Sequence, residues 1–186
     1  HNRCRRQRQM CIRDRFKFYL IKTGENFLLT STVYLIIISF LSVAVIDLWQ
    51  RIAHRLGGSA PTDWGIIGRW LLMIFSHRII VNTQLQETDA YPNERTIGWI
   101  FHYLVGGAYV IVYFILWKIC GLISTTIWDG FVFGAISVLV PWFFFMPAIG
   151  AGILARKTPN PTFVCISAFI THSIFGVSIA LLLKAM

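Results

Sequence analysis

Charged side chains are scarce in this sequence. Only 13% of its 186 residues are Asp, Glu, Lys or Arg, whereas 56% are hydrophobic and 15% are aromatic. A soluble domain carries about 25% charged residues, so this composition argues against a soluble domain. The mean hydropathy of +0.64 agrees, and the apolar residues stand in long blocks. We therefore expect an integral membrane protein, with the lipid bilayer as its partner.

Cysteine pairs and the common catalytic signatures are missing. None of the four cysteines forms a Cys-x-x-Cys motif, so neither a zinc knuckle nor a disulfide framework is indicated. The sequence has no Walker loop, no Gly-x-Ser-x-Gly and no His-Glu-x-x-His. Gly150-x-Gly152 is too short for a nucleotide-binding loop. No reaction and no cofactor follows from these motifs.

The excess of positive charge comes largely from a short N-terminal arm. Residues 1–15 hold six arginines and one aspartate, a net +5 out of the total of +9. Such an arm could tether anionic lipid or nucleic acid. However, residues 6–15 resemble a translated sequencing adapter, so we expect the arm, residues 1–15, to be non-native and exclude it from fold reasoning. Without it no basic patch interleaved with aromatic residues remains, and we expect no nucleic-acid binding.

Residues 16–186 are expected to form a single all-α, polytopic membrane domain with four transmembrane helices. A span needs about 20 apolar residues. The four segments that satisfy this are about 27–49, 97–117, 130–155 and 162–183. Proline removes a backbone donor, so the third segment should kink near Pro141 or break around Pro147.

A fifth apolar segment, residues 64–81, is interrupted by Arg69, His77 and Arg78. Thr62 or Asp63 could cap a helix that begins near Trp64. The segment is marginally short for a span. It predicts an interfacial helix with its arginines toward headgroups, and a re-entrant helix is the alternative.

Four spans place both chain ends on one side of the membrane and residues 50–96 and 156–161 on the other, which we call the loop pole. The loop pole carries seven basic residues and the opposite face four, if residues 1–15 are left out. Because positive charge favours the cytoplasm, this count favours a cytoplasmic loop pole. If the basic residues of the arm, residues 1–15, are counted, the predicted orientation is reversed.

Two histidines lie inside predicted spans, each in a stripe of small residues. His102 stands between Gly98 and Gly106, and His172 stands four residues before Gly176. Small residues at this spacing let helices approach closely in lipid, so both imidazoles should face protein. At 1.5 Å per residue, His102 lies about 8 Å and His172 about 15 Å from the loop-pole ends of their helices.

Further polar residues are predicted near the same end of the spans, so the sequence favours a polar pocket open to the loop pole and covered by residues 64–81. The pocket candidates are Asp47, Arg69, Glu94, Arg95, His102, Tyr103, Asn160 and His172. Arg69 and Arg95 could bind a phosphate headgroup, but pairing with Asp63, Glu94 or lipid is the simpler interpretation. Asn160, between two prolines, fits turn chemistry.

Four interpretations of the histidines remain open. Asp47, His102 and His172 could bind zinc or iron, although no fixed ligand spacing is present. They could relay protons or ions, or a histidine could act as general base on a lipid. Alternatively, each histidine could donate a hydrogen bond to a neighbouring helix and serve packing alone.

The order of the motifs resembles that of a bacterial family of small inner-membrane proteins, domain of unknown function 2938. The motifs that carry the resemblance are Asp47-Leu48-Trp49, Gly68-Arg69-Trp70, Glu94-Arg95-x-x-Gly98-Trp99-x-x-His102-Tyr103, Pro141, Pro147-x-x-Gly150-x-Gly152, Thr158-Pro159-Asn160-Pro161 and His172-x-x-Phe175-Gly176. The resemblance covers about residues 33–183. It implies a multi-pass protein of the bacterial inner membrane and no established activity.

We therefore expect a non-enzymatic membrane protein that acts in transport, in ion or proton handling, or as a membrane partner. The alternative is a small membrane-embedded enzyme, metal-assisted in one version, that acts on a lipid-like substrate. The small size argues against a complete monomeric transporter and leaves a homo-oligomer open.

Overall fold

The computed structural model describes residues 30–185 except 79 and 83. The basic arm, residues 1–15, lies outside the described residues. By internal contacts the chain divides into two compact units, residues 1–37 and 38–186. The described part of the first unit is helical. Every contact discussed below lies within the second unit.

Four helices are long and apolar enough to cross a membrane, and no strand occurs in the described part of the chain. They are Thr30–Arg55, Glu94–Ile119, Ile127–Ala148 and Pro161–Lys184. The second consists of α3 (Glu94–Phe114) and a π-helical turn, Ile115–Ile119. The third consists of α4 (Ile127–Ser137), a π-helical turn, Pro141–Phe145, and α5 (Met146–Ala148). The fourth is α6 (Pro161–Lys184). The all-α membrane fold with four spans is as predicted.

The third helix is shorter than the predicted segment 130–155, because it ends at Ala148. Gly150 and Gly152 follow with φ of 90° and 78°, a backbone region that glycine adopts without a steric penalty. Residues after Ala148 therefore turn out of the helix, and a short 3₁₀ turn follows at Ile153–Ala155. The break near Pro147 is the alternative that occurs, and Pro141 begins a π-helical turn.

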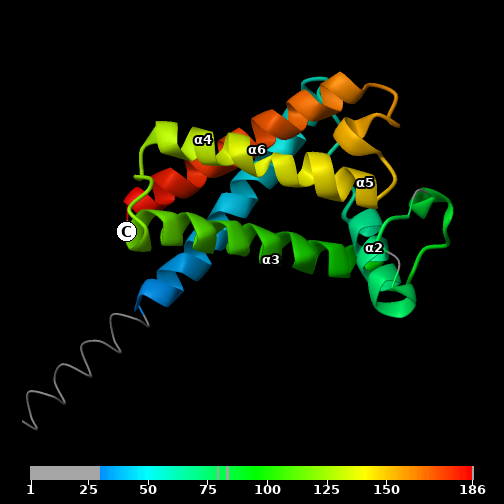
Figure 1. Ribbon diagram of the computed structural model, residues 1–186, viewed down its shortest axis with the longest axis horizontal. Helices are drawn as coiled ribbons and strands as arrows, with labels where there is room; N and C mark the ends of the chain where they lie inside the picture. Colours follow the sequence, from blue (N-terminus) through cyan, green and yellow to red (C-terminus); the bar gives the residue numbers. More distant parts are fainter. Residues whose placement is uncertain (1–29, 79, 83, 186) are drawn as a thin grey trace, which may run out of the picture. The chain divides into compact units, whose positions relative to one another are not determined.

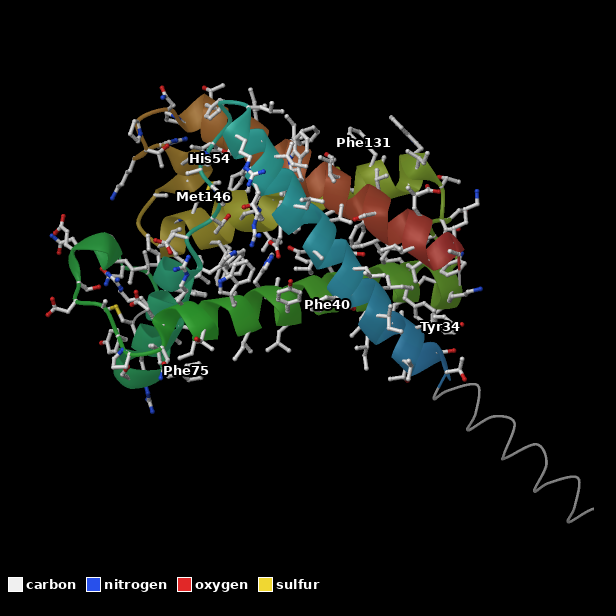
Figure 2. All side chains as sticks on the ribbon, turned by 180° about the vertical axis from the view of Figure 1, so that it is seen from behind. Tyr34, Phe40, His54, Phe75, Phe131 and Met146 are labelled. Carbon is white, nitrogen blue, oxygen red and sulfur yellow. The ribbon has the colours of Figure 1, made fainter. Side chains whose placement is uncertain are left out.

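The shorter apolar helix α2 (Trp64–His77) begins at the predicted residue. Asp63 caps it, since its Oδ1 accepts a hydrogen bond from the backbone N–H of Gly65 at 2.8 Å. Fourteen residues extend about 21 Å, less than the roughly 30 Å of a hydrocarbon core. Figure 1 shows α2 at the N-terminal end of α3. Phe75 of α2 is 82% exposed (Figure 2).

The helices pack in two pairs, α2 with α3 and α4 with α6. In the first pair a Cβ built on Gly68 would meet the carbonyl oxygen of Glu94, and one on Gly98 would meet that of Trp64. In the second pair a Cβ on Gly130 would lie 2.7 Å from the Gly176 carbonyl oxygen. Side-by-side packing of α4 and α6 is visible in Figure 1. Glycine thus permits backbone-to-backbone contact, as small-residue stripes in lipid predict.

A cluster of apolar side chains fixes α2 against the rest of the unit. Its buried members are Trp70, Met73, Leu85 and Ala148. Trp70 is 3% exposed and donates its indole N–H to the carbonyl of Ile80 at 2.7 Å. Phe101 of α3 and Phe145 pack against the Trp70 ring edge-on. Because this cluster holds α2, it also positions the first turn of that helix, which contributes to the candidate site.

Candidate functional site

Asp47 and His102 form a shielded carboxylate–imidazole pair. Asp47 lies in the Thr30–Arg55 helix and His102 in α3. Nε2 of His102 is 2.9 Å from Oδ1 of Asp47, and the two side chains are 8% and 12% exposed. The Tyr103 hydroxyl donates to the second carboxylate oxygen at 3.3 Å. Both oxygens of the carboxylate are therefore held by side chains of α3.

Aromatic rings enclose this pair. Trp64, in the first turn of α2, stacks on His102 with ring centroids 3.9 Å apart. Trp99 contacts the same imidazole edge-on at 5.7 Å, and Phe40 stacks on Tyr103 at 5.1 Å. The close Gly68–Gly98 crossing brings Trp64 to this position. The rings fix the imidazole plane and shield the pair from lipid.

Arg69 and Glu94 form a second polar cluster. Arg69 Nε donates to Glu94 Oε2 at 2.8 Å and Nη2 donates to Oε1 at 2.9 Å. Nη1 donates to the carbonyls of Thr88, at 2.6 Å, and Leu85, at 3.4 Å. The hydrogen bond from Glu94 raises the pKa of the Arg69 guanidinium above its usual range. All three guanidinium nitrogens have protein acceptors, which favours the pairing interpretation over phosphate binding.

His172 belongs to a different set of contacts. Its Nδ1 lies 2.8 Å from Oγ of Ser137, across the α4–α6 contact. The Tyr109 ring of α3 meets its imidazole edge-on, with centroids 6.3 Å apart. In the described residues no hydrogen bond joins His172 to Asp47 or His102. No three His, Cys, Asp or Glu side chains there could hold a metal ion together. The proposed Asp47–His102–His172 ligand set is thus divided in two.

Arg95 and Asn160 stand apart from both clusters. Arg95 is exposed, one residue after Glu94. Asn160 is also exposed and precedes α6, where its carbonyl accepts the backbone N–H of Val164 at 3.1 Å. Its side chain forms no capping bond. The turn interpretation of Asn160 agrees with this position.

Trp64 and Ser137 contact the two histidines but are not among the residues that the sequence predicts for the site. Trp64 contacts His102, and Ser137 contacts His172. Asp63 as an N-cap indicated that Trp64 begins a helix, but nothing in the sequence indicated which helix end it would meet. Ser137 lies three residues after Gly134 of the small-residue pair on α4, which is the one signal that it faces another helix.

An open depression lies beside the Arg69–Glu94 cluster. It is lined by Met73, Glu87, Thr88, Asp89, Ala90 and Tyr91. Its lining includes neither histidine, so it is not the histidine-containing pocket predicted from the sequence.

Comparison with known proteins gives one family. A family model described as "Protein of unknown function (DUF2938)" matches residues 36–185. No curated protein and no solved structure matches this chain.

Proposed function

This chain belongs to the DUF2938 family of proteins of unknown function, and from that premise we propose that it is a proton-handling protein of the bacterial inner membrane. The observation that carries the proposal is the Asp47–His102 pair, 2.9 Å apart and shielded on two apolar helices. Ionisable groups in hydrocarbon are costly and are usually retained for function. Imidazole is the side chain that changes charge nearest to neutral pH.

The pair has the parts that a proton-binding site needs. The imidazole of His102 can bind and release a proton at its ring nitrogens. The Asp47 carboxylate and the Trp64 ring hold the imidazole in one orientation while it gains and loses the proton. The Tyr103 hydroxyl occupies the second carboxylate oxygen, so His102 is the member of the cluster with a ring nitrogen left for exchange.

Access is proposed from the loop pole. Arg51, one helical turn beyond Asp47, is exposed, and the helix ends at Arg55. The pair therefore lies about 6 Å along the helix from an exposed charged residue. With the loop pole cytoplasmic, protons would enter from the cytoplasm.

Proton flux into proteoliposomes tests this proposal. The purified protein is reconstituted with a pH-sensitive dye inside the vesicles, and a potassium gradient with valinomycin drives the flux. We expect the wild type to exceed empty vesicles, and His102→Gln and Asp47→Asn to lower the flux about 100-fold, the contribution typical of a positioned proton-transfer group. His54→Gln is the matched control, because His54 is an exposed histidine on the same helix as Asp47.

A wild-type flux equal to that of empty vesicles would refute the proposal, as would full flux in both His102→Gln and Asp47→Asn. Metal content measured on the same preparations separates proton handling from a metal-assisted enzyme. A stoichiometric transition metal that is lost in His102→Gln would favour the enzyme.

A further inference from the structure

We propose that the proton pathway continues from the Asp47–His102 pair, past the buried hydroxyl of Ser42, to His172. This inference rests on the proposed function and gives it a route through the hydrocarbon zone. It uses four side chains from three helices: Asp47 and Ser42 of the Thr30–Arg55 helix, His102 of α3 and His172 of α6.

Depth along α3 relates the two histidines. Tyr109, whose ring meets His172, is seven residues after His102 on α3. Seven residues span about 10 Å along a helix. His172 therefore lies about 10 Å, or roughly two helical turns, deeper than His102, too far for direct proton transfer.

Ser42 lies at a depth between the two. Asp47 contacts His102, and Val43 lies against Gly106, so the Thr30–Arg55 helix and α3 run antiparallel here. Moving back from Asp47 therefore follows α3 toward Tyr109. Ser42 is five residues before Asp47, about 7 Å deeper, and its side chain is fully buried.

The Ser42 hydroxyl differs from the ordinary buried serines of this chain. Serine inside a helix usually bonds a carbonyl of the preceding turn. Ser137 does so with Gly134, and Ser178 does so with Phe175, both at 2.7 Å. Ser42 and Ser173, the neighbour of His172, are buried and have no hydrogen-bond partner in the described residues.

A buried hydroxyl without a partner costs stability, and water is the usual partner for such a group. The hydroxyl of Ser42 lies between the two histidines in depth, and that of Ser173 lies beside His172. We therefore expect bound water at both positions. Water molecules held near Ser42 and Ser173 would divide the distance between His102 and His172 into shorter steps.

The hydrogen bonds of Ser137 orient His172 for this role. A hydroxyl has one proton to donate, and Ser137 donates it to the Gly134 carbonyl. Its oxygen then accepts from Nδ1–H of His172 at 2.8 Å. That arrangement leaves Nε2 of His172 as the basic nitrogen. In the transfer, the His102 imidazolium releases a proton to the nearest of these waters, protons pass from one water to the next, and the last water releases a proton to Nε2 of His172. Every water is regenerated.

The same vesicle assay tests the route with variants outside the Asp47–His102 pair. We expect Ser42→Ala and His172→Gln each to lower proton flux about tenfold or more, and Ser42→Thr, which keeps a hydroxyl, to retain it. Ser178→Ala is the control, since it removes a buried hydroxyl that is already satisfied within its helix. Circular dichroism and monodispersity in detergent check that each variant folds.

Wild-type flux in folded Ser42→Ala and His172→Gln, together with loss in His102→Gln, would overturn the route and leave the proposed function standing. No flux in the wild type would overturn both. If Ser42→Ala does not fold, His172→Gln carries the test, with the same two outcomes.

Discussion

At the scale of single residues, the Arg69 guanidinium joins three segments. It bonds Glu94 at the start of α3 and two carbonyls of the loop that connects α2 to α3. Removing one member of a shielded ion pair leaves the other charge unpaired. We therefore expect Arg69→Ala to lower the free energy of unfolding by about 2–3 kcal/mol, measured as a lower midpoint of thermal unfolding in detergent.

Arg95→Ala is the control for that variant. Arg95 is exposed and adjacent in sequence to Glu94, so its loss should change the midpoint little, as for surface charges generally. Equal destabilisation by both substitutions would mean that the arginines act through overall charge rather than through the contacts of Arg69.

His102 and His172 differ in how well the sequence predicts their contacts. The depth of a residue along its helix follows from the sequence, because the rise per residue is fixed. Asp47 and His102 have similar predicted depths, so the sequence predicts that they lie near each other. Which neighbouring helix a residue contacts depends on how the helices are arranged around one another. Depth along the helix does not determine that arrangement. The sequence therefore predicts His172 in the same pocket as Asp47, whereas in the structure His172 contacts Ser137 and Tyr109.

At the scale of helices, Gly98 should be among the least replaceable positions. A Cβ there would meet the backbone of Trp64 and lie 3.1 Å from the backbone nitrogen of Gly68. Since backbone atoms cannot rotate away, α2 must shift. We expect Gly98→Ala to lower stability by about 1–3 kcal/mol, the usual range for overpacking, and to lower proton flux because Trp64 moves from His102.

Gly107→Ala provides the comparison on the same helix. A Cβ at Gly107 would make ordinary contacts with Ser39 at 3.6–3.7 Å. Its unfolding midpoint should stay at or above that of the wild type, because alanine favours helix more than glycine does. A larger loss in Gly107→Ala than in Gly98→Ala would contradict the close crossing of α2 and α3.

The sequence predicts the four long helices correctly, but it predicts their first and last residues less well. Long apolar runs identified all four spans, because hydrocarbon requires about 20 apolar residues. The first helix continues to Arg55 rather than ending at Trp49, and α3 begins at Glu94 rather than at Ile97. Polar residues can extend a helix beyond the apolar run, so hydropathy alone places the ends poorly.

At the scale of the whole molecule, four spans predict the sides on which the connections lie. A reporter fused after Ala90, in the loop between α2 and α3, and one fused after Met186 should report opposite sides of the membrane. Paired alkaline phosphatase and green fluorescent protein fusions measure this. Four spans place three crossings between the two fusion points. Both reporters on one side would require an even number of crossings between them, and the four-span topology would be wrong.

The glycine contacts have a consequence for how this sequence can change over time. Glycine is the smallest residue, so every amino-acid replacement at Gly68, Gly98 or Gly134 adds a Cβ where backbone atoms already lie. The lipid-facing positions, such as Leu104 at 67% exposure, can exchange one apolar side chain for another. Substitutions should therefore accumulate on the outer surface of the helices. At the helix crossings a substitution needs a compensating shift of the partner helix.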